Sequence, residues 1–590
     1  MRMKVLAAML ALAGVAGLSA PAEAQRRVAP VRVNIIGFND FHGALEPPRM
    51  AITAPGRNGG EVRVPVGGAA YVASAVRRLR AGNPNTVVVA AGDLISASPL
   101  ISAGFLDEPT IMALNLIGLD YASVGNHEFD RGWRELLRMQ NGGCERFTNR
   151  QPCRLDRFPG ARFRYLSANV RTGTGQTLFP ASAMRSFGSG RRRVRVGFVG
   201  LTLRNTHTLV TPSGVAGLRF EDEADSINTA ARRLRAQGAD AVVVMIHEGL
   251  DTTGRYNDQT CPGVTGDLLP ILSRLDRGGV DVVVSGHTHH SYICDYGRID
   301  PTRPILVTSA EKNGSILTNI TLTIDPRRNR VIAKQANNVL VQGEAYEDRR
   351  GAVPVTDLYP AFPRDPAVHA LVSRYAAAAA PILARPIGRL AGPALKEANE
   401  AGESVAGNLV ADAFLAATSA PEAGGAQIAV TNQTSIRTDI VPAADGTVTF
   451  GQLFAAQPFA NNLVVMTLTG RQLNAVLEQQ FASGPNTVAS PIMLNLSRGF
   501  TYSYDLRRPE GQRIIDMRLN GAPVTPDGSY RVTVNSFLAA GGDSFTVFRQ
   551  GTNPVGGELD VDAVERYIAA MGQTPPPLPP ANRVTRLSPR

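Results

Sequence analysis

The sequence predicts two α/β domains joined by a single helix. Between residues 31 and 344, short β-branched runs alternate with helical segments, which is the pattern of sheets covered by helices. A helical stretch at 365–384 is flanked by prolines, and a second mixture of strand-like and helix-like runs follows it. The expected parts are a first domain at 30–345, a connecting helix at 363–386, an α/β or α+β domain at 387–572 and a Pro-rich tail at 573–590.

The strands of the first domain are predicted from short β-branched runs, each followed by a polar cluster. These runs cover 31–38, 85–92, 119–125, 193–200, 240–247, 280–287 and 304–310. Helical patterns lie between the runs, for example at 67–81 and 225–239. In the second domain we expect helices and strands in the same mixture. The helices are expected at 404–418 and 469–481, and the strands at 462–469 and 530–537.

Residues 1–24 are typical of a secretory signal peptide. Two basic residues precede an apolar run at 5–18, and an A-x-A cleavage site ends at Ala24. A buried N-terminal helix is the alternative interpretation. Gln25 is not a cysteine, which argues against a lipid anchor. No later run approaches the ~18 apolar residues that a membrane span needs, so we expect no span. We expect a soluble protein that is secreted to the periplasm after cleavage behind Ala24.

The chain has four cysteines, an even number that suits disulfide bonds in an oxidising compartment. Three pairings are possible. We expect Cys144–Cys153, which would close a short loop, and Cys261–Cys294. A zinc site is the alternative, but the sequence has no C-x-x-C pair to support it.

The formal net charge of +11 raises the possibility of a nucleic-acid partner. The basic residues are mostly dispersed arginines, with one short cluster at 191–193. This distribution favours a general positive surface over a binding stripe, so we expect no nucleic-acid partner. Such a surface field could still attract small anions.

Polar side chains gather where the predicted strands of the first domain end. The carboxyl ends of strands are where open α/β sheets place their ligand sites. One histidine at such a position is more often structural, but five of the eight histidines in the chain lie there, together with two aspartates and an asparagine. The strand-end residues are Asp40, His42, Asp93, Asn126, His127, His247, His287 and His289.

This mixture of side chains indicates a site for two metal ions. Imidazole and carboxylate ligands together suit divalent Zn, Mn, Fe or Co better than Mg alone. Two ions ~3.5–4 Å apart need a bridging carboxylate, and Asp93, alone on its strand, is the natural bridge. Such a pair can hold a hydroxide and clamp the oxygens of an in-line displacement at phosphorus. His127 follows the expected ligand Asn126, so it is a candidate to protonate the leaving oxygen, with Asp130 orienting it.

The order D-x-H, G-D, G-N-H-E, lone His and G-H-x-H resembles the calcineurin-like metallophosphoesterase pattern. The stretch "GNHEFDRG" is similar to the form in exported 5′-nucleotidases. In the second domain, "GESVAGNLVADAF", "TNQTSIRTDI", "QPFANNLV" and "FLAAGGDSF" resemble the substrate domain of the same family. The resemblance covers nearly the whole mature chain. It implies a four-layer N-terminal domain, a β-sandwich flanked by helices, and an α+β substrate-binding domain after the connecting helix.

The resemblance also implies a role for each matching residue. One divalent ion, expected to be Zn, Mn or Co, would be held by Asp40, His42, Asp93 and His289, and the other by Asp93, Asn126, His247 and His287. His127 and Asp130 match the catalytic dyad. The residues that match the substrate contacts are Asn432 and Arg437 for base or phosphate, Phe459 and Phe537 for stacking on the base, and Asp543 for the ribose.

Two positions depart from the family pattern. Glu400 stands where a second phosphate-contacting arginine is common, and Thr434 and Ser435 replace two glycines before Arg437. These changes bear on the preferred base and phosphate chain, because added Cβ atoms restrict the backbone of that loop.

The leading hypothesis is an exported hydrolase of nucleoside 5′-monophosphates that also acts on nucleotide sugars or diphosphates. A 2′,3′-cyclic phosphodiesterase with 3′-nucleotidase activity is the alternative within the same class. A non-catalytic nucleotide-binding protein is the alternative outside it, but every expected ligand and both dyad residues are present.

Overall fold

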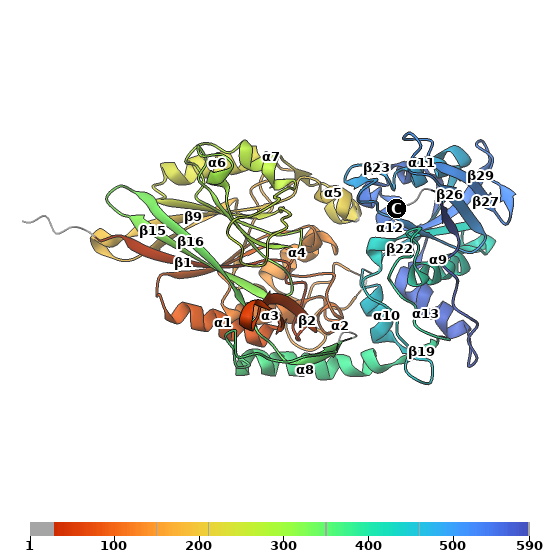
Figure 1. Ribbon diagram of the computed structural model, residues 1–590, viewed down its shortest axis with the longest axis horizontal. Helices are drawn as coiled ribbons and strands as arrows, with labels where there is room; N and C mark the ends of the chain where they lie inside the picture. The colour runs from red at the N-terminus through yellow and green to blue at the C-terminus, as the bar shows by residue number, and fades with distance from the viewer. Residues whose placement is uncertain (1–28, 149, 211, 349–350, 460, 588–590) are drawn as a thin grey trace, which may run out of the picture.

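The computed structural model describes residues 29–590 except 149, 211, 349–350, 460 and 588–590. The expected signal peptide at 1–24 lies outside the described residues. The chain forms an N-terminal lobe and a C-terminal lobe, with helix α8 (Pro366–Ala384) between them (Figure 1). The expected connecting helix therefore begins and ends within three residues of the predicted bounds.

The N-terminal lobe contains two six-stranded sheets. The order of the first is β16-β15-β1-β4-β5-β6, and that of the second is β13-β14-β12-β11-β9-β8. The first sheet consists of β16 (Arg330–Leu340), β15 (Ile316–Asp325), β1 (Val31–Phe38), β4 (Thr86–Ala91), β5 (Tyr121–Ser123) and β6 (Arg164–Leu166). The second consists of β13 (Ser291–Asp295), β14 (Leu306–Ala310), β12 (Val282–Ser285), β11 (Ala241–His247), β9 (Val194–Thr202) and β8 (Ser182–Phe187). All seven expected strands are present.

The two sheets pack face to face and carry helices on their outer faces. Val33 of β1 and Phe198 of β9 belong to one buried apolar cluster between the sheets. Helices α1 (Ala69–Ala81) and α3 (Glu108–Ile117) pack on the outer face of the first sheet. On the second sheet, α6 (Glu223–Ala236) and α7 (Leu268–Ser273) do the same. This order of helix, sheet, sheet and helix confirms the expected four-layer β-sandwich.

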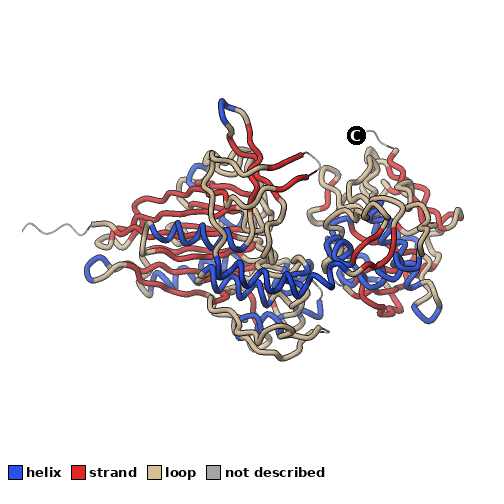
Figure 2. Tube along the Cα trace, turned by 90° about the horizontal axis from the view of Figure 1, so that it is seen from below, coloured by secondary structure: helices blue, strands red, loops and turns tan. Residues whose placement is uncertain are grey.

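Helix α8 runs along the N-terminal lobe toward the C-terminal lobe (Figure 2). The Asp365 carboxylate caps it by accepting from the backbone N–H of Val368 at 3.0 Å. Among the described helices, α8 is the one with the length and hydropathy to cross a membrane, although the sequence had indicated no such stretch. Length and composition alone are weak evidence that a helix spans a membrane. In addition, Leu371 and Tyr375 of α8 are buried in the core of the N-terminal lobe.

The C-terminal lobe is a mixed α/β structure, as expected. Its five-stranded sheet has the order β25-β20-β29-β22-β30, and its four-stranded sheet has the order β28-β27-β26-β31. The first consists of β25 (Leu494–Leu496), β20 (Ile428–Asn432), β29 (Ser529–Asn535), β22 (Asn462–Thr469) and β30 (Thr552–Leu559). The second consists of β28 (Ala522–Pro523), β27 (Ile514–Leu519), β26 (Phe500–Tyr504) and β31 (Val584–Arg586). The main helices are α9 (Val405–Thr418), α10 (Phe450–Ala456), α11 (Gly470–Glu478) and α13 (Asp560–Ala570).

The segment expected as a Pro-rich tail is partly structural. Strand β31 pairs in parallel with β26, with Tyr502 opposite Val584. Arg583 is buried and forms an ion pair with Asp412 of α9, with Nη2 and Oδ2 2.7 Å apart. Proline content had concealed this strand, so the C-terminal lobe extends past residue 572, where we had expected it to end.

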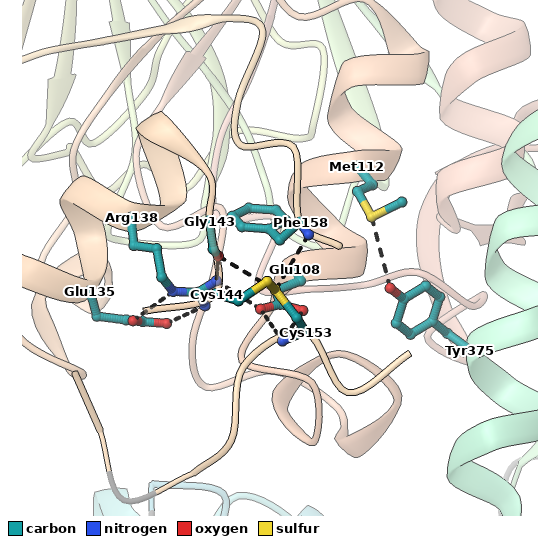
Figure 3. Close-up of a disulfide and its surroundings, with 9 residues drawn as sticks. All are labelled: Glu108, Met112, Glu135, Arg138, Gly143, Cys144, Cys153, Phe158 and Tyr375. Atoms are coloured by element: carbon teal, nitrogen blue, oxygen red, sulfur yellow. Dashed lines mark hydrogen bonds and ion pairs between the residues drawn. A yellow bond between two sulfur atoms is a disulfide. The ribbon is translucent and has the colours of Figure 1, made fainter. Parts of the chain in front are cut away.

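Both expected disulfide bonds are present, Cys144–Cys153 and Cys261–Cys294, and the zinc alternative for the cysteines is excluded. The first bond closes a loop beside α3 (Figure 3).

Candidate active site

The strand-end residues of both sheets of the N-terminal lobe meet at one edge of the sandwich. Asp40 and His42 follow β1, Asp93 follows β4, and Asn126 follows β5. His247 ends β11 of the second sheet, and His287 and His289 follow β12. Because β1, β4 and β5 are parallel neighbours, as are β11 and β12, their carboxyl ends lie side by side.

Six of the seven expected ligands form two compact groups that could each hold a metal ion. One group is Asp40, His42 and His289, and the other is Asp93, His247 and His287. Within each group the potential ligand atoms lie within 4.8 Å of one another. Oδ2 of Asp93 is 2.9 Å from Nε2 of His247 and 3.8 Å from Nε2 of His42. The carboxylate of Asp93 therefore contacts its own group and reaches the other.

The donor atoms in this region fit a cation. Asp40 Oδ1, His247 Nε2 and Asn126 Oδ1 are buried and make no well-formed hydrogen bond to any described residue. The near polar neighbours of the first two are other expected ligands, namely His289 Nε2 at 3.3 Å from Asp40 Oδ1 and Asp93 Oδ2 at 2.9 Å from His247 Nε2. Buried polar atoms without partners are costly, unless a ligand satisfies them. Three such atoms on neighbouring strand ends are accounted for together if they coordinate metal ions.

The backbone at the strand ends is held in an unusual conformation. Asp40, His42, Asp93, His287 and His289 all have φ between 46° and 72°. This left-handed region is disfavoured for residues with a Cβ, and such strain is typical of functional sites.

Glycine is required beside the ligands because the chain segments approach closely. A Cβ on Gly125 would lie 2.1 Å from Oδ1 of Asp93, and one on Gly286 would lie 2.9 Å from Oδ2 of Asp40. The glycines of G-N-H-E and G-H-x-H are therefore explained by packing against the ligands.

Three of the expected ligands are oriented by a second contact. The ring nitrogens Nδ1 of His42 and His247 face the carbonyl oxygens of Ser96 and Ala91, at 3.0 and 2.8 Å. These contacts direct Nε2 of each ring toward the metal groups. Asn39 donates through Nδ2 to Oδ2 of Asp40 at 2.7 Å. The sequence had given no role to Asn39, although it lies directly before the D-x-H motif.

Glu128 is a second positioning residue that the sequence had not assigned. Its carboxylate accepts hydrogen bonds from three backbone N–H groups, those of Asp93 at 2.8 Å, Leu94 at 2.8 Å and Gly125 at 2.6 Å. It thereby joins the ends of β4 and β5. Burial and the nearby Asp93 raise the pKa of Glu128 to about 7.

The histidines differ in their protonation in ways that suit their positions. Burial lowers the pKa of His42 to about 3 and that of His287 to about 4, so both imidazoles are neutral and can donate a lone pair. Burial also opposes the charge on His247, but Asp93 outweighs it and raises the pKa of His247 to about 10. A cation between His247 and Asp93 would take the place of that proton.

His127 and Asp130 form the expected pair. Nδ1 of His127 lies 2.7 Å from Oδ2 of Asp130, and the backbone N–H of His127 donates to Oδ1 of Asp93 at 2.9 Å. Burial lowers the pKa of His127, but Asp130 and Asp93 raise it to about 9 overall. The raised pKa of His127 favours the protonated ring, which is the form that can give a proton.

A cavity of about 580 Å³ lies between the two lobes and opens on this pair. Its N-terminal wall includes Asn126, His127, Asp130 and His287. All five expected substrate residues line the opposite wall, namely Asn432, Arg437, Phe459, Phe537 and Asp543. The structure thus brings the two groups of candidate metal ligands (the metal groups), the His127–Asp130 dyad and the expected substrate residues around one cavity.

The aromatic and charged side chains of the C-terminal wall are arranged toward the dyad. The ring of Phe459 is stacked on that of His127, with centroids 5.9 Å apart and planes at 14°. The guanidinium of Arg437 lies over the same phenylalanine, 5.6 Å from the ring centre. The ring of Phe537 covers Gly542, where a Cβ would lie 2.5 Å from it.

The departure at Thr434 alters the surroundings of Asp543. Thr434 donates its hydroxyl hydrogen to Oδ2 of Asp543, and Asn432 donates to the same oxygen at 2.7 Å. Burial raises the pKa of Asp543, which these two donors oppose. Glu400 is exposed and is absent from the residues lining this cavity.

The cavity also has lining residues that the sequence had not singled out. Those on the N-terminal side include Arg131, Trp133, Arg134, Phe147 and Arg150, and those on the C-terminal side include Asn535, Ser536 and Leu559. Arg131 follows Asp130 directly, so it could have been noticed, but the position of the others depends on loop packing.

The fold and this donor set define a metal-dependent phosphoester hydrolase. The calcineurin-like phosphoesterase family matches residues 33–291, and the 5′-nucleotidase C-terminal domain family matches residues 386–550. The chain belongs to the 5′-nucleotidase family of calcineurin-like phosphoesterases. Members of this class use a dimetal centre, and the two ligand groups correspond to it.

Individual relatives agree with this family. The structure is similar to a 5′-nucleotidase precursor of Thermus thermophilus, with a TM-score of 0.68, 25% identity and coverage of 94% of this chain and 99% of the other. A probable 5′-nucleotidase of Treponema pallidum is 24% identical over 92% of this chain and 93% of its own. Endonuclease YhcR of Bacillus subtilis is 28% identical over 93% of this chain, which spans 41% of that relative.

Proposed function

We propose that the protein is an exported two-metal phosphohydrolase that releases phosphate from nucleoside 5′-monophosphates. The observation that carries this proposal is the shared cavity, in which the His127–Asp130 pair faces Phe459 and Phe537. A phosphate at the metal groups and an aromatic base at the phenylalanines fit the two walls of one pocket. The names of two relatives, a 5′-nucleotidase precursor and a probable 5′-nucleotidase, support the same substrate class.

We assign the two ions to the ligands expected from the sequence. Asp40, His42, Asp93 and His289 would hold one, and Asp93, Asn126, His247 and His287 the other. The mixture of imidazole and carboxylate favours Zn, Mn or Co. When bound, two such ions supply positive charge at the phosphoryl oxygens and lower the pKa of water.

The proton needed by the leaving oxygen comes from His127. Asp130 holds the ring through Nδ1, which leaves Nε2 free to donate. Neither residue is a ligand in this assignment, so their task is proton transfer and not metal retention.

The C-terminal wall holds the nucleoside. Two aromatic faces can bind a base by stacking, at ~1–3 kcal/mol per base. Asp543 can accept hydrogen bonds from ribose hydroxyls, and Asn432 and Arg437 lie where base or phosphate oxygens can be contacted. Binding energy from the nucleoside thus serves to position the phosphoryl group at the metal groups.

Export and a periplasmic location are part of the proposal. Residues 1–24 support both, because they have the basic residues, the apolar run and the A-x-A site of a signal peptide. The two disulfide bonds support both as well, because disulfides persist in oxidising compartments.

A phosphate-release screen tests the function. The purified mature protein would be assayed with AMP, 3′-AMP, 2′,3′-cyclic AMP and UDP-glucose, with added Mn, Zn or Co. We expect the highest kcat/KM with AMP. Preference for the cyclic or 3′ nucleotide would favour the alternative phosphodiesterase, and binding without turnover under any metal would favour a nucleotide-binding protein.

A further inference from the structure

The loop closed by the first disulfide forms part of the cavity wall. Cys144 and Cys153 join its two ends, and between them Phe147, Thr148 and Arg150 line the same cavity as His127. This wall belongs to the N-terminal lobe and is separate from the C-terminal wall, to which the nucleoside is assigned.

Both ends of the loop are anchored to a buried charged network (Figure 3). The Glu108 carboxylate accepts from the backbone N–H of Cys153 at 3.0 Å. Arg138, which is 3% exposed, donates to the carbonyl of Gly143 at 2.9 Å and to Glu108 at 2.8 Å. The disulfide and these bonds fix the loop at its base, so its cavity-lining side chains start from a rigid support.

Arg150 has unused hydrogen-bonding capacity in this position. Its guanidinium has five N–H donors. In the described part of the chain, the guanidinium of Arg150 makes one hydrogen bond, from Nη1 to the carbonyl of Ala103 at 3.1 Å. It also lies over the ring of Phe454, 5.7 Å from the ring centre. No carboxylate of the described residues forms an ion pair with it.

The charges around Arg150 are mixed. Arg131, also in the cavity wall, forms an ion pair with the buried Asp107. Burial lowers the pKa of Arg150, and so do the charges of Arg131 and Arg154, while Asp107 and the exposed Asp562 of α13 raise it. Asp107 is already engaged by Arg131, so the charge of Arg150 itself is left to face the cavity.

We propose that Arg150, with Arg131 beside it, binds a second phosphate group of the nucleotide. This inference rests on the proposed nucleotidase function and extends its substrate class to nucleotides with two phosphates. Arginine is suited to the task because its planar fork can make two parallel hydrogen bonds to one phosphate. The second phosphate can come from a 5′-diphosphate or from a 3′,5′-bisphosphate, and the test distinguishes the two.

The kinetic test compares one substitution in this loop with one directly after it. Arg150→Gln removes the charge but keeps much of the side chain, and Arg154→Gln is the matched control. Arg154 is exposed, bonds to the carbonyl of Gly104 and is absent from the residues lining the cavity. Each variant would be assayed in its metal-loaded form with AMP, ADP and adenosine 3′,5′-bisphosphate.

Arg150→Gln should lower kcat/KM about 10-fold or more on ADP or on the bisphosphate relative to AMP, the usual loss for a hydrogen bond to a charged group. Arg154→Gln should leave these ratios unchanged. The substrate that shows the loss identifies the source of the second phosphate. Equal losses on all three substrates, or none on either two-phosphate substrate, would overturn the proposal.

A binding measurement separates this proposal from the proposed function. Trp133 is the single tryptophan of the chain and lines the same cavity, so its fluorescence reports on occupancy. The metal-loaded protein would be titrated with the α,β-methylene analogue of ADP, which is not turned over. If AMP is not hydrolysed, the nucleotidase proposal fails, whereas a Kd weakened about 10-fold by Arg150→Gln and not by Arg154→Gln still supports the subsite. The same Kd in parent and both variants, together with unchanged kinetic ratios, would refute the subsite alone.

Discussion

Oδ2 of Asp93 lies 2.9 Å from Nε2 of His247, and the same oxygen is 3.8 Å from Nε2 of His42. One carboxylate thus faces a histidine from each of the two ligand groups. In a two-metal site this is the position of a bridge, whose loss affects both ions and not one.

Asp93→Ala should therefore lose both metals and abolish turnover. The measurement is the metal content of the purified protein, by mass spectrometry, together with phosphate release from AMP. Asp225→Ala, which removes an exposed carboxylate on α6, is the control and should retain two ions. Two ions per chain in Asp93→Ala would rule out the bridging assignment.

His127→Ala should keep both metals but lower turnover by ~10²–10⁴-fold, the usual range for general acid–base catalysis. The reason is that His127 supplies a proton and is not a ligand. p-Nitrophenolate leaves with little need of protonation, so the turnover of p-nitrophenyl phosphate should fall less than the turnover of AMP. An equal loss on both substrates would contradict the role of His127 as an acid.

Glu128→Gln tests the positioning of the ligand loops. A carboxamide cannot accept from all three N–H groups that Glu128 now satisfies, because one end of it is itself a donor. We expect metal affinity to fall by ~10–100-fold, as is common when a partner of a ligand is lost. Excess metal should restore most of the activity. Unchanged metal affinity, measured by competition with a chelator, would show that Glu128 has no part in holding the ligands.

Arg583→Met tests the contribution of the C-terminal segment to stability. Breaking a buried ion pair leaves an unpaired charge and costs ~3–5 kcal/mol, here at Asp412. The double variant Asp412→Leu/Arg583→Met should recover part of the loss in urea unfolding. As a control, Arg471→Met removes an exposed partner of Asp527 and should change the unfolding free energy by ~0–1 kcal/mol. An equally small change in Arg583→Met would mean that β31 is held by other contacts.

The local sequence signals predicted the strands and the positions of the strand-end residues, while the four-layer sandwich was implied by the family resemblance. β-branched runs mark buried strands, and residues directly after a strand, such as Asp40 and Asp93, must lie at its end. The structure was needed where a role depends on partners far along the chain. Glu128 binds backbone N–H groups, which carry no residue identity, and Arg150 reaches the cavity through a disulfide-closed loop. Strand β31 was concealed by its proline-rich surroundings.

The stack of Phe459 on His127 joins the C-terminal lobe to the His127–Asp130 pair, at a centroid distance of 5.9 Å. Phe459 and Phe537 belong to one lobe and the metal groups to the other, so a base held by the phenylalanines can present its phosphate only across the cavity. A substrate without a nucleobase gains no binding energy from stacking on the two phenylalanines. We therefore expect its hydrolysis to be independent of these two phenylalanines.

Phe459→Ala combined with Phe537→Ala should therefore depress kcat/KM for AMP by ~10²-fold or more, from two stacking contacts of ~1–3 kcal/mol each. Hydrolysis of p-nitrophenyl phosphate should stay near the parent rate, because the metal groups and His127 are retained. Phe450→Ala, in α10 of the same lobe and outside the cavity lining, is the control for a general effect of losing a phenylalanine. If the double variant turned over AMP as the parent does, the base would not bind at these phenylalanines. The preference for nucleosides would then have to arise elsewhere on the cavity wall.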